Sequence, residues 1–590
     1  MLRHLTDYAA TRGLVTETGF APKAARWAIR FSDTGQYLGV IEIGDVEAKR
    51  NPGLEFAWAP DLSHSELVSG PADEKRCHFL IESADVVALY VRDEPDDRVQ
   101  KKHDFFVRML REASEAVSEL TSAADALEDE EILTRIREEL DEQGAAYTDK
   151  VTIRCGESFP AAERHWHDWW RGFRAALTPD SDEEGPLHCD LITGEVVIPA
   201  ATHPKVSGLA SVGGQAAGSS LVSFDKDAFT SYGLDQSANC AVSEATATAY
   251  CSALNHLLQH HSRRLSNMVL VHWFKERIPP EDDPLPFVIG TEEEHELDAQ
   301  DRARKLLEAV HSGERPDLGD NYFYAMSMSG SGGRVMIRDW MEGQFETLLR
   351  NILAWFDDLQ IVHRQGGGMA PPPKFMAVIG ATVRDLGDAP APFTNGMLRS
   401  ALHGAAISRT AMVKALQRVR VDIIGDETPN HARMGLLRAY HVRNSRLRGD
   451  DVMSEATTPL LNEQHPSPAY HCGRLMAVLA GLQRAALGDV GAGVVQRYYA
   501  AASTTPSLVL GRLTRNSQFH LSKLSGDSPG LAYWYEDRIG EIYRRLGDTI
   551  PKTLAPEEQS LFALGYYQQL VDLRTSKKTP EDVEGESINE

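Results

Sequence analysis

The sequence predicts an α+β protein of more than one domain, with a mixed α/β N-terminal region followed by an all-α helical bundle. Three observations support this fold class. The chain has 590 residues, more than a single hydrophobic core normally reaches. Short runs with the two-residue alternation of strands recur up to about residue 340. Beyond about residue 392, apolar residues recur at helical spacing instead, and strand patterns become scarce.

A β-hairpin is predicted near the N-terminus. In WAIRFSDTGQYLGVIEIGD (residues 27–45), Trp27, Ile29 and Phe31 alternate with smaller or polar residues, and an Asp-Thr-Gly turn precedes a second β-rich run. Further strand-like runs, with helices expected between them, cover residues 78–91, 196–199, 221–224, 268–273, 322–328 and 334–339. We therefore expect one mixed α/β region over residues 1–365.

Helical periodicity defines the predicted C-terminal domain. Apolar residues between 475 and 482 follow the i, i+3, i+4, i+7 spacing of one helix face. The glycines and prolines of GGGMAPPPK (residues 366–374) interrupt both strand and helix patterns, so we predict a linker over residues 366–391. The helical domain is then expected over residues 392–575, and the polar residues 576–590 are expected to form a disordered tail.

Composition narrows the class of protein. No run of about 18 apolar residues could span a bilayer, and the N-terminus lacks the apolar core of a secretory signal. We therefore expect a cytoplasmic protein with reduced cysteines and no membrane partner. The six cysteines are scattered, with no C-x-x-C pair and no histidines at zinc-finger spacing, so neither a structural metal nor another cofactor is predicted.

Charge is distributed unevenly along the chain. The formal net charge of -25 argues against a protein that coats itself in nucleic acid, because neutralising phosphates requires Lys and Arg. Acidic runs at residues 128–143 and 281–296 are expected to be solvated surfaces, with repulsive faces toward a partner as the less favoured alternative. By contrast, residues 399–448 are locally cationic, and between residues 470 and 523 the cations are opposed only by Asp489. A cationic surface can therefore exist within this acidic chain.

Two glycine-rich loops are candidates for close contact with a phosphate or a base. GGQAAGSSLVSF (residues 213–224) includes a predicted strand, and SGSGGR (residues 329–334) lies between two predicted strands. Because glycine has no Cβ, backbone N–H groups in such loops can approach a ligand closely. The first loop fits neither the P-loop nor the dinucleotide-binding motif, and a flexible turn is an equally good interpretation. The second is either a tight hairpin or a phosphate cradle.

The segment ERHWHDWW (residues 163–170) raises the alternative of a metal-dependent hydrolase. His165, His167 and Asp168 have side chains that can bind a metal ion. The two histidines are two residues apart, however, which places them on different faces of a helix. Core packing by the tryptophans is the favoured interpretation. With no G-x-S-x-G motif and no assignable histidine partner for Cys240, the sequence predicts no catalytic site and hence no enzyme.

Several long motifs in a fixed order identify a family more specifically than any single loop does. They are SSLVSFDKDAFTSYGLDQSANCAVSEATATAYCSALNHLL (residues 219–258), NYFYAMSMSGSGGRVMIRDW (321–340), PAYHCGRLMAVLAGLQ (468–483), RYYAAASTTPSLVLGRLTRNSQFHLSKL (497–524) and QSLFALGYYQQ (559–569). Together with the N-terminal hairpin motif, they resemble the large subunit of the type I-C CRISPR surveillance complex (Cascade), CRISPR-associated protein family eight, subtype I-C. The similarity covers essentially the whole chain.

This resemblance implies a non-catalytic subunit of an RNA-guided antiviral complex. Such a subunit sits at the 5′ end of the guide CRISPR RNA, beside the backbone and 5′-end-binding subunits. It recognises the protospacer-adjacent motif (PAM) on double-stranded DNA, promotes R-loop formation and helps to recruit the helicase-nuclease. Because base pairing with the guide reads the long target sequence, the protein itself needs only a small polar reader.

In our interpretation, the segment around residues 213–244 supplies that reader, because small hydroxyl and amide side chains can probe the edges of base pairs. The predicted DNA-binding residues are Gln215, Ser219, Ser220, Lys226, Ser231, Tyr232, Gln236 and Asn239, with Lys205, Arg334 and Arg338 as predicted phosphate contacts. For these last three, a surface cation with little specific contact is an equally good interpretation. The aromatic residues Phe224, Phe229 and Tyr232 either pack in a core or abut an unstacked base.

The C-terminal helical domain resembles a fusion to the small subunit of the family. In the family this region is also made separately from an internal start, for which Met453 is the candidate here. The residues predicted to bind the displaced strand are Arg474, Arg484, Arg497, Arg512, Arg515 and Lys523. A solvated helix face is the alternative for these cations. For the whole chain, a scaffold that touches only protein partners is the main alternative function, and a metal-dependent hydrolase is the weaker one.

Overall fold

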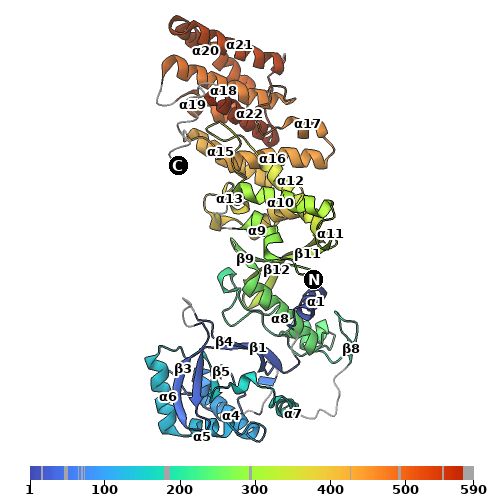
Figure 1. Cartoon of the computed structure of the whole chain (residues 1–590). Coiled ribbons are helices and arrows are strands. Elements are labelled where there is room, and N and C mark those ends of the chain that lie inside the picture. Colours follow the sequence, from blue (N-terminus) through green and yellow to red (C-terminus); the bar gives the residue numbers. More distant parts are fainter. Residues whose placement is uncertain are drawn as a thin grey trace. The chain divides into compact units, whose positions relative to one another are not determined.

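The computed structural model describes residues 1–14, 17–45, 51–63, 66–67, 71, 73–177, 187–230, 232–290, 296–425, 427–488, 493–547 and 550–575. The protein is α+β, as the sequence predicts, and it divides into two compact units (Figure 1). Unit 1 consists of Met1–His260 and Gly330–Val335, and unit 2 of His261–Ser329 and Met336–Glu590. In the described part of the chain, no helix is both long and apolar enough to cross a membrane.

Unit 1 contains a four-stranded sheet in the order β3 (Tyr37–Glu42), β2 (Trp27–Phe31), β6 (Lys150–Cys155) and β5 (Glu82–Ser83). The predicted hairpin is confirmed, because β2 and β3 pair antiparallel with Ile29 opposite Val40, while β2 and β6 run parallel. The strand predicted at residues 78–91 is wrong for most of its length, since α3 (Ala84–Val87) directly follows the short β5. This run is apolar because it is buried, not because it alternates across a sheet.

Helices close the core of this sheet. They are α4 (Asp97–Ala113), α5 (Leu120–Glu128), α6 (Glu130–Glu142) and α7 (His167–Leu177). Phe106 of α4 and Ile136 of α6 lie in the same buried cluster as Trp27 of β2. Figure 1 shows α4, α5 and α6 gathered around the strands. A second, two-stranded sheet pairs β1 (Phe20–Ala25) with β4 (Leu54–Pro60) antiparallel.

The rest of unit 1 is mostly loops and short elements. α1 (Leu2–Thr11) packs against α8 (Glu244–His260), and β7 (His188–Cys189) pairs with β8 (Val196–Val197). Two 3₁₀ turns, η3 (Asp227–Phe229) and η4 (Gln236–Cys240), lie in the loop before α8. Residues 221–224 do not form the predicted strand, because the pairing of this loop stops at Ser220, which bridges Arg334.

Unit 2 contains one sheet, in the order β12 (Arg334–Gln344), β11 (Tyr322–Ser331), β10 (Met268–Phe274) and β9 (Ser262–Leu265). β10 runs antiparallel to both β9 and β11. The strands predicted at residues 268–273, 322–328 and 334–339 are therefore confirmed. The tip of the β11–β12 hairpin, Gly330–Val335, is assigned to unit 1.

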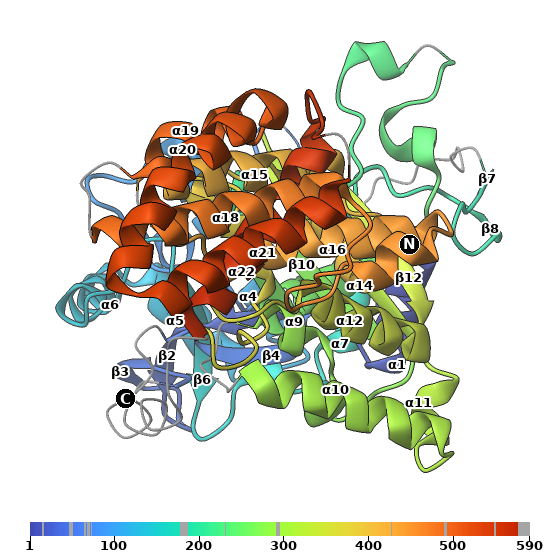
Figure 2. The same cartoon turned by 90° about the horizontal axis from the view of Figure 1, so that it is seen from above.

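The helices of unit 2 share one hydrophobic core with that sheet. They are α9 (Leu285–Ile289), α10 (Glu296–His311), α11 (Pro316–Gly319), α12 (Phe345–Leu359), α13 (Phe375–Gly380), α14 (Ala391–Leu402), α15 (Arg409–Ile424), α16 (His431–Leu447), α17 (Asp451–Ala456), α18 (Pro468–Leu487), α19 (Val494–Ala502), α20 (Pro506–Asp527), α21 (Pro529–Leu546) and α22 (Pro556–Thr575). A single buried cluster runs from Leu265 to Val571. α18 and α22 pack closely, because a Cβ at Gly473 would overlap the carbonyl oxygen of Phe562. Figure 2 shows α18, α21 and α22 side by side in orange and red.

The boundary between the units differs from the predicted one. The sequence predicts a linker over residues 366–391, whereas the chain divides between His260 and His261. α13 lies within the predicted linker, and its Phe375 and Val378 are fully buried in the core of unit 2. Glycine and proline mark irregular backbone, but they do not reveal whether the neighbouring side chains join a core. The predicted tail, residues 576–590, lies outside the described residues.

Candidate nucleic-acid interface

A cavity in unit 1 brings together three of the predicted DNA-binding residues. Its volume is about 780 Å³, and Lys205, Ser220 and Gln236 line it. Its wall also includes Asp61, His78, Thr202, His203, Asp225 and Glu244. A cavity of this size accommodates a ligand as large as a nucleotide. We call it the unit 1 cavity.

The two glycine-rich loops pack against each other beside Ser220. Gly213 has a φ of +90°, and a Cβ there would lie 2.8 Å from the carbonyl oxygen of Gly330. A Cβ at Gly330 would in turn overlap the backbone of Gly214. Gly332 (φ +54°) and Gly333 (φ +85°) form the turn between β11 and β12. The tight-hairpin interpretation of SGSGGR is therefore confirmed, and Gly213 and Gly330 allow the close contact between the two loops.

Hydrogen bonds fix Ser219 and Ser220 in the first loop. Val206 and Ser219 exchange two backbone bonds of 2.8 Å, and the hydroxyl of Ser219 accepts from the Gln215 N–H at 3.2 Å. Because Ser219 is buried, its side chain stabilises the loop and is not exposed to DNA, contrary to the prediction. The N–H of Ser220 donates to the carbonyl of Gly333 at 2.8 Å, and Ser220 lines the cavity. The side chain of Gln215 is exposed.

Gln236 lines the cavity at the start of η4. Its φ of +45° lies in the left-handed region, which costs a residue with a side chain on the order of 1 kcal/mol. Asn239 holds this backbone, since its Nδ2 donates to the carbonyl oxygens of Leu234 (3.3 Å) and Gln236 (3.1 Å). The amide of Asn239 is thus used within the loop, whereas the exposed Gln236 is available to a ligand.

The aromatic residues of this region divide between packing and exposure. Phe224 and Phe229 meet edge to face with ring centroids 5.3 Å apart, and both are half-buried. The two rings therefore pack against each other, but neither belongs to the buried clusters of the described residues, so packing in a core is not confirmed. Tyr232 is 90% exposed, and Lys226 is also exposed. Ser231 lies outside the described residues.

The acidic residues of the cavity wall each have a cationic partner. The pairs are Asp61 with Lys23 (2.8 Å), Glu244 with Arg174 (2.6 Å) and Asp225 with Arg334 (3.1 Å). Arg334 also donates to the carbonyl oxygen of Ser223 at 3.3 Å. Because these charges nearly cancel, the cavity is suited to hydrogen bonds with base edges more than to attraction of phosphates.

Two histidines of the wall are neutral at pH 7. Burial, with the charge of Lys23, lowers the pKa of His78 to about 4, and burial lowers the pKa of His203 to about 4. Nδ1 of His203 lies 2.5 Å from the hydroxyl of Tyr250, whereas its Nε2 has no hydrogen-bond partner among the described residues. The hydroxyl of Thr202 is likewise without a partner there. Both atoms are buried, so neither is exposed to a ligand in the cavity.

Sequence reasoning missed this part of the wall. Glu244 lies within the motif of residues 219–258, whereas Asp61, His78 and His203 come from separate segments that belong to no motif. Only the fold brings them together, so no local signal in the sequence could have found them.

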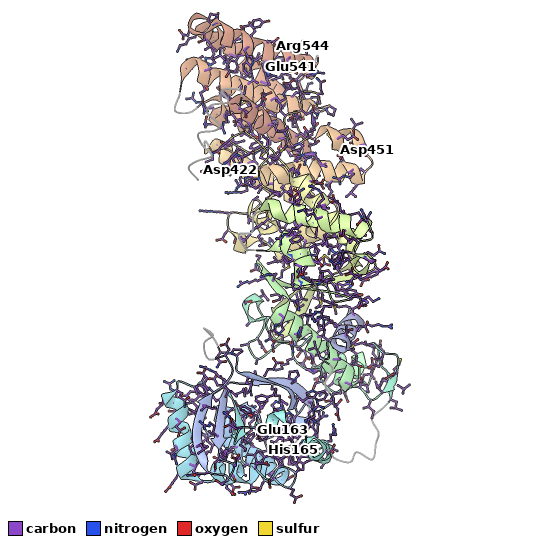
Figure 3. The ribbon with its side chains drawn as sticks, viewed as in Figure 1. Glu163, His165, Asp422, Asp451, Glu541 and Arg544 are labelled. Carbon is purple, nitrogen blue, oxygen red and sulfur yellow. The ribbon has the colours of Figure 1, made fainter. Side chains whose placement is uncertain are left out.

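The tryptophan-rich segment serves the core of unit 1. Trp166 and Trp170 are fully buried, and their indole N–H groups donate to the carbonyl oxygens of Pro160 (2.8 Å) and Gly19 (2.7 Å). His165 is exposed near Glu163 (Figure 3). The core-packing interpretation is confirmed. Among the residues that the structure describes, no group of three His, Cys, Asp or Glu side chains could hold a metal ion.

Arg474 of unit 2 is not a surface cation, contrary to the prediction. Its side chain is fully buried, 2.9 Å from Glu541 of α21, and its Nε donates to Gln569 of α22 at 3.0 Å. Figure 3 labels Glu541 near Arg544 on α21. Arg474 therefore joins α18 to two other helices. Local charge counting failed here because an arginine within a helical pattern can face a buried acidic partner.

The other predicted displaced-strand residues are exposed. Arg484 lies in the last turn of α18 and lines a cavity of about 160 Å³ together with Arg574, and Arg497 lies on α19. Arg512, Arg515 and Lys523 share α20. None of these five predicted cations forms an ion pair with another described residue. Met453, the candidate internal start, lies within α17, and Arg338 of β12 donates to the hydroxyl of Ser329 at 2.8 Å.

Comparison with known proteins decides the family. Residues 3–574 match the family model described as CRISPR-associated protein (Cas_Csd1). The chain belongs to this family. The match confirms the resemblance to the large subunit of the type I-C complex, and no curated protein matches the chain. A Cas_Csd1 protein is a component of a CRISPR complex, which contains guide RNA and other CRISPR-associated subunits.

Proposed function

We propose that this Cas_Csd1 chain is the non-catalytic large subunit of a type I-C complex in the cytoplasm. In this proposal it docks at the 5′ end of the guide RNA, recognises the PAM on double-stranded DNA, promotes R-loop formation and helps to recruit the helicase-nuclease. Family membership supports the assignment to a CRISPR complex. The observation that carries the reading role is the unit 1 cavity, which collects Lys205, Ser220 and Gln236.

The chemistry of the cavity fits a reader of a few base pairs. Guide pairing supplies the long sequence specificity, so the protein must distinguish only a short flank. An exposed amide at Gln236 and a hydroxyl at Ser220 can donate to or accept from base edges. The paired charges around them limit attraction to unrelated DNA.

The exposed cations of unit 2 support a second part of the same role. Once the duplex opens, the displaced strand carries one uncompensated phosphate per nucleotide, and cations without acidic partners can hold it. Arg497 of α19 and the three cations of α20 meet this condition among the described residues. Holding the displaced strand would favour the open state over re-annealing.

The test is DNA binding by the reconstituted guide complex, with and without this chain. The duplexes match the guide and differ only in the few base pairs beside the target. We expect flank-dependent binding that requires this chain. Equal binding on every flank, or binding that does not need the chain, would instead favour a scaffold that contacts only protein partners.

A further inference from the structure

α20 carries a row of cations and apolar residues on its solvent-facing side. Leu508, Arg512, Arg515, Phe519 and Lys523 follow one another at spacings of three or four residues, which places them on one face of the helix. The opposite side, with Leu510, Leu513 and Leu521 among others, is buried in the core of unit 2. The exposed row therefore contributes little to the packing of this helix in the core. We call the part from Arg512 to Lys523 the α20 face.

The charge of this face lacks local compensation. α20 has no acidic residue before Asp527 at its end, although the chain as a whole has a net charge of -25. Arg512, Arg515 and Lys523 form no ion pair with another described residue. Elsewhere exposed arginines do, as with Arg171 and Glu17 at 2.6 Å. The α20 face thus attracts an anion from outside the described chain.

Phe519 makes this face more than a cationic surface. Its side chain is 78% exposed, so this large aromatic ring faces water and contributes little to the hydrophobic core. It lies four residues from both Arg515 and Lys523, about 6 Å along the helix in each direction. An exposed ring between two cations suits a base stacked on the ring and phosphates held on either side.

We propose that the α20 face is a track for single-stranded DNA in which Phe519 stacks on an unpaired base. Stacking gives the track its preference for single strands, because the bases of a duplex are already stacked and must be extruded to reach a protein ring. Charge complementarity favours this occupant over a protein surface, which would have to be both acidic and able to cover Phe519. The inference rests on the proposed function, in which the displaced strand is the DNA that reaches this face.

The test compares two oligomers of equal length, oligothymidylate and its abasic counterpart, by fluorescence anisotropy with the full chain. The unmodified protein should bind oligothymidylate more tightly than the abasic oligomer. Phe519→Ala should weaken binding of oligothymidylate about tenfold and leave binding of the abasic oligomer unchanged. Phe519→Trp should restore the preference for bases. All variants should keep the melting temperature of the parent, since this side chain is exposed.

A matched control lies on the same side of α20, one turn before the α20 face. Leu508 is 76% exposed, but it is aliphatic and cannot stack, so Leu508→Ala should leave both affinities within about twofold of the parent. Loss of binding in this variant equal to that of Phe519→Ala would mean that the face offers only apolar area, which overturns the stacking proposal.

The remaining outcomes separate the inference from the proposed function. If the full chain and the guide complex bind neither oligomer, the displaced-strand role and the inference fail together. If both are bound and Phe519→Ala behaves as the parent, the inference fails while the role of the cations stands. If Phe519→Ala leaves DNA affinity unchanged and releases the chain from a partner subunit, the face is a protein contact and the inference is overturned.

Discussion

The unit 1 cavity and the α20 face differ in whether their charged side chains have partners of opposite charge. The acidic groups around the cavity are paired with cations, as in Asp225 with Arg334 at 3.1 Å and Glu244 with Arg174 at 2.6 Å. The cations of α20 have no such partners among the described residues. Paired charges favour discrimination by hydrogen bonds, whereas unpaired cations favour affinity that depends on salt. One chain can therefore recognise a short sequence at one site and hold a single strand at another.

The two regions also differ in how they are built. The cavity wall consists largely of loops, held by backbone contacts that require Gly213 and Gly330. The α20 face is one regular helix fixed by a buried side. A loop can place donors and acceptors in an irregular pattern, while a helix repeats similar groups at a constant spacing.

The largest effect on stability is expected at Gly473, in the helical unit that carries α20. Gly473→Ala places a methyl group against the carbonyl oxygen of Phe562 and should destabilise unit 2 by about 3 kcal/mol. Circular dichroism should show a lower melting temperature. The control is Gly511→Ala on α20, which has open space around it and should be neutral or stabilising by up to about 1 kcal/mol. An unchanged melting temperature for Gly473→Ala would show that α18 and α22 are not in such close contact.

Removing the cations of α20 should change the salt dependence of binding. For Arg512→Ala, Arg515→Ala and Lys523→Ala combined, the slope of log K against log salt on single-stranded DNA should fall in magnitude by about 2. Titrations at several salt concentrations measure it. Arg409→Ala is the control, because this exposed arginine is already paired with Glu557 at 2.5 Å and should leave the slope unchanged. A slope that stays the same in the triple variant would rule out phosphate contacts on this face.

Substituting Gln236 should reduce discrimination between flanking sequences without changing the salt dependence of DNA binding. Gln236→Ala should reduce the ratio of affinities for preferred and non-preferred flanks about tenfold, since a base contact of this kind contributes about 1–3 kcal/mol. Gln236→Gly should lose the same discrimination while relieving the left-handed backbone. Competition binding by the guide complex measures the ratio. Full discrimination in both variants would remove Gln236 from the reader.

The smallest effect is expected at Asp225, which pairs with Arg334. Asp225→Asn should release Arg334 for a phosphate and raise affinity for duplex DNA about twofold to threefold at low salt, with a salt slope steeper by up to about 1. Stability should change by less than about 1 kcal/mol, because the pair is exposed. If affinity does not rise, Arg334 does not reach DNA.

Much of the fold could be predicted from local patterns. The β2–β3 hairpin, β10 to β12 and the buried tryptophans of residues 163–170 all follow from spacing. The unit boundary could not be predicted, because the burial of Phe375 and Val378 depends on distant helices. Arg474 shows the same limit, since its partners Glu541 and Gln569 lie far away in the sequence.

The candidate site was predictable only where one segment supplies it. Ser220 and Gln236 come from the glycine-rich and amide-rich stretch, and the structure places both at one cavity. His78 and His203 reach the same cavity from other segments, so spacing gives no signal for them. Hydrogen bonds assign Ser219 and Asn239 to the loop itself rather than to a ligand, and a sequence does not display these bonds.

The most direct measurement records two quantities for two variants in the reconstituted guide complex: the flank ratio and the salt slope of target binding. The account predicts that Gln236→Ala lowers the flank ratio and keeps the slope, whereas the triple variant of Arg512, Arg515 and Lys523 lowers the slope and keeps the ratio. If each variant changes both quantities to the same extent, sequence recognition and strand binding do not belong to separate sites, which contradicts the proposal.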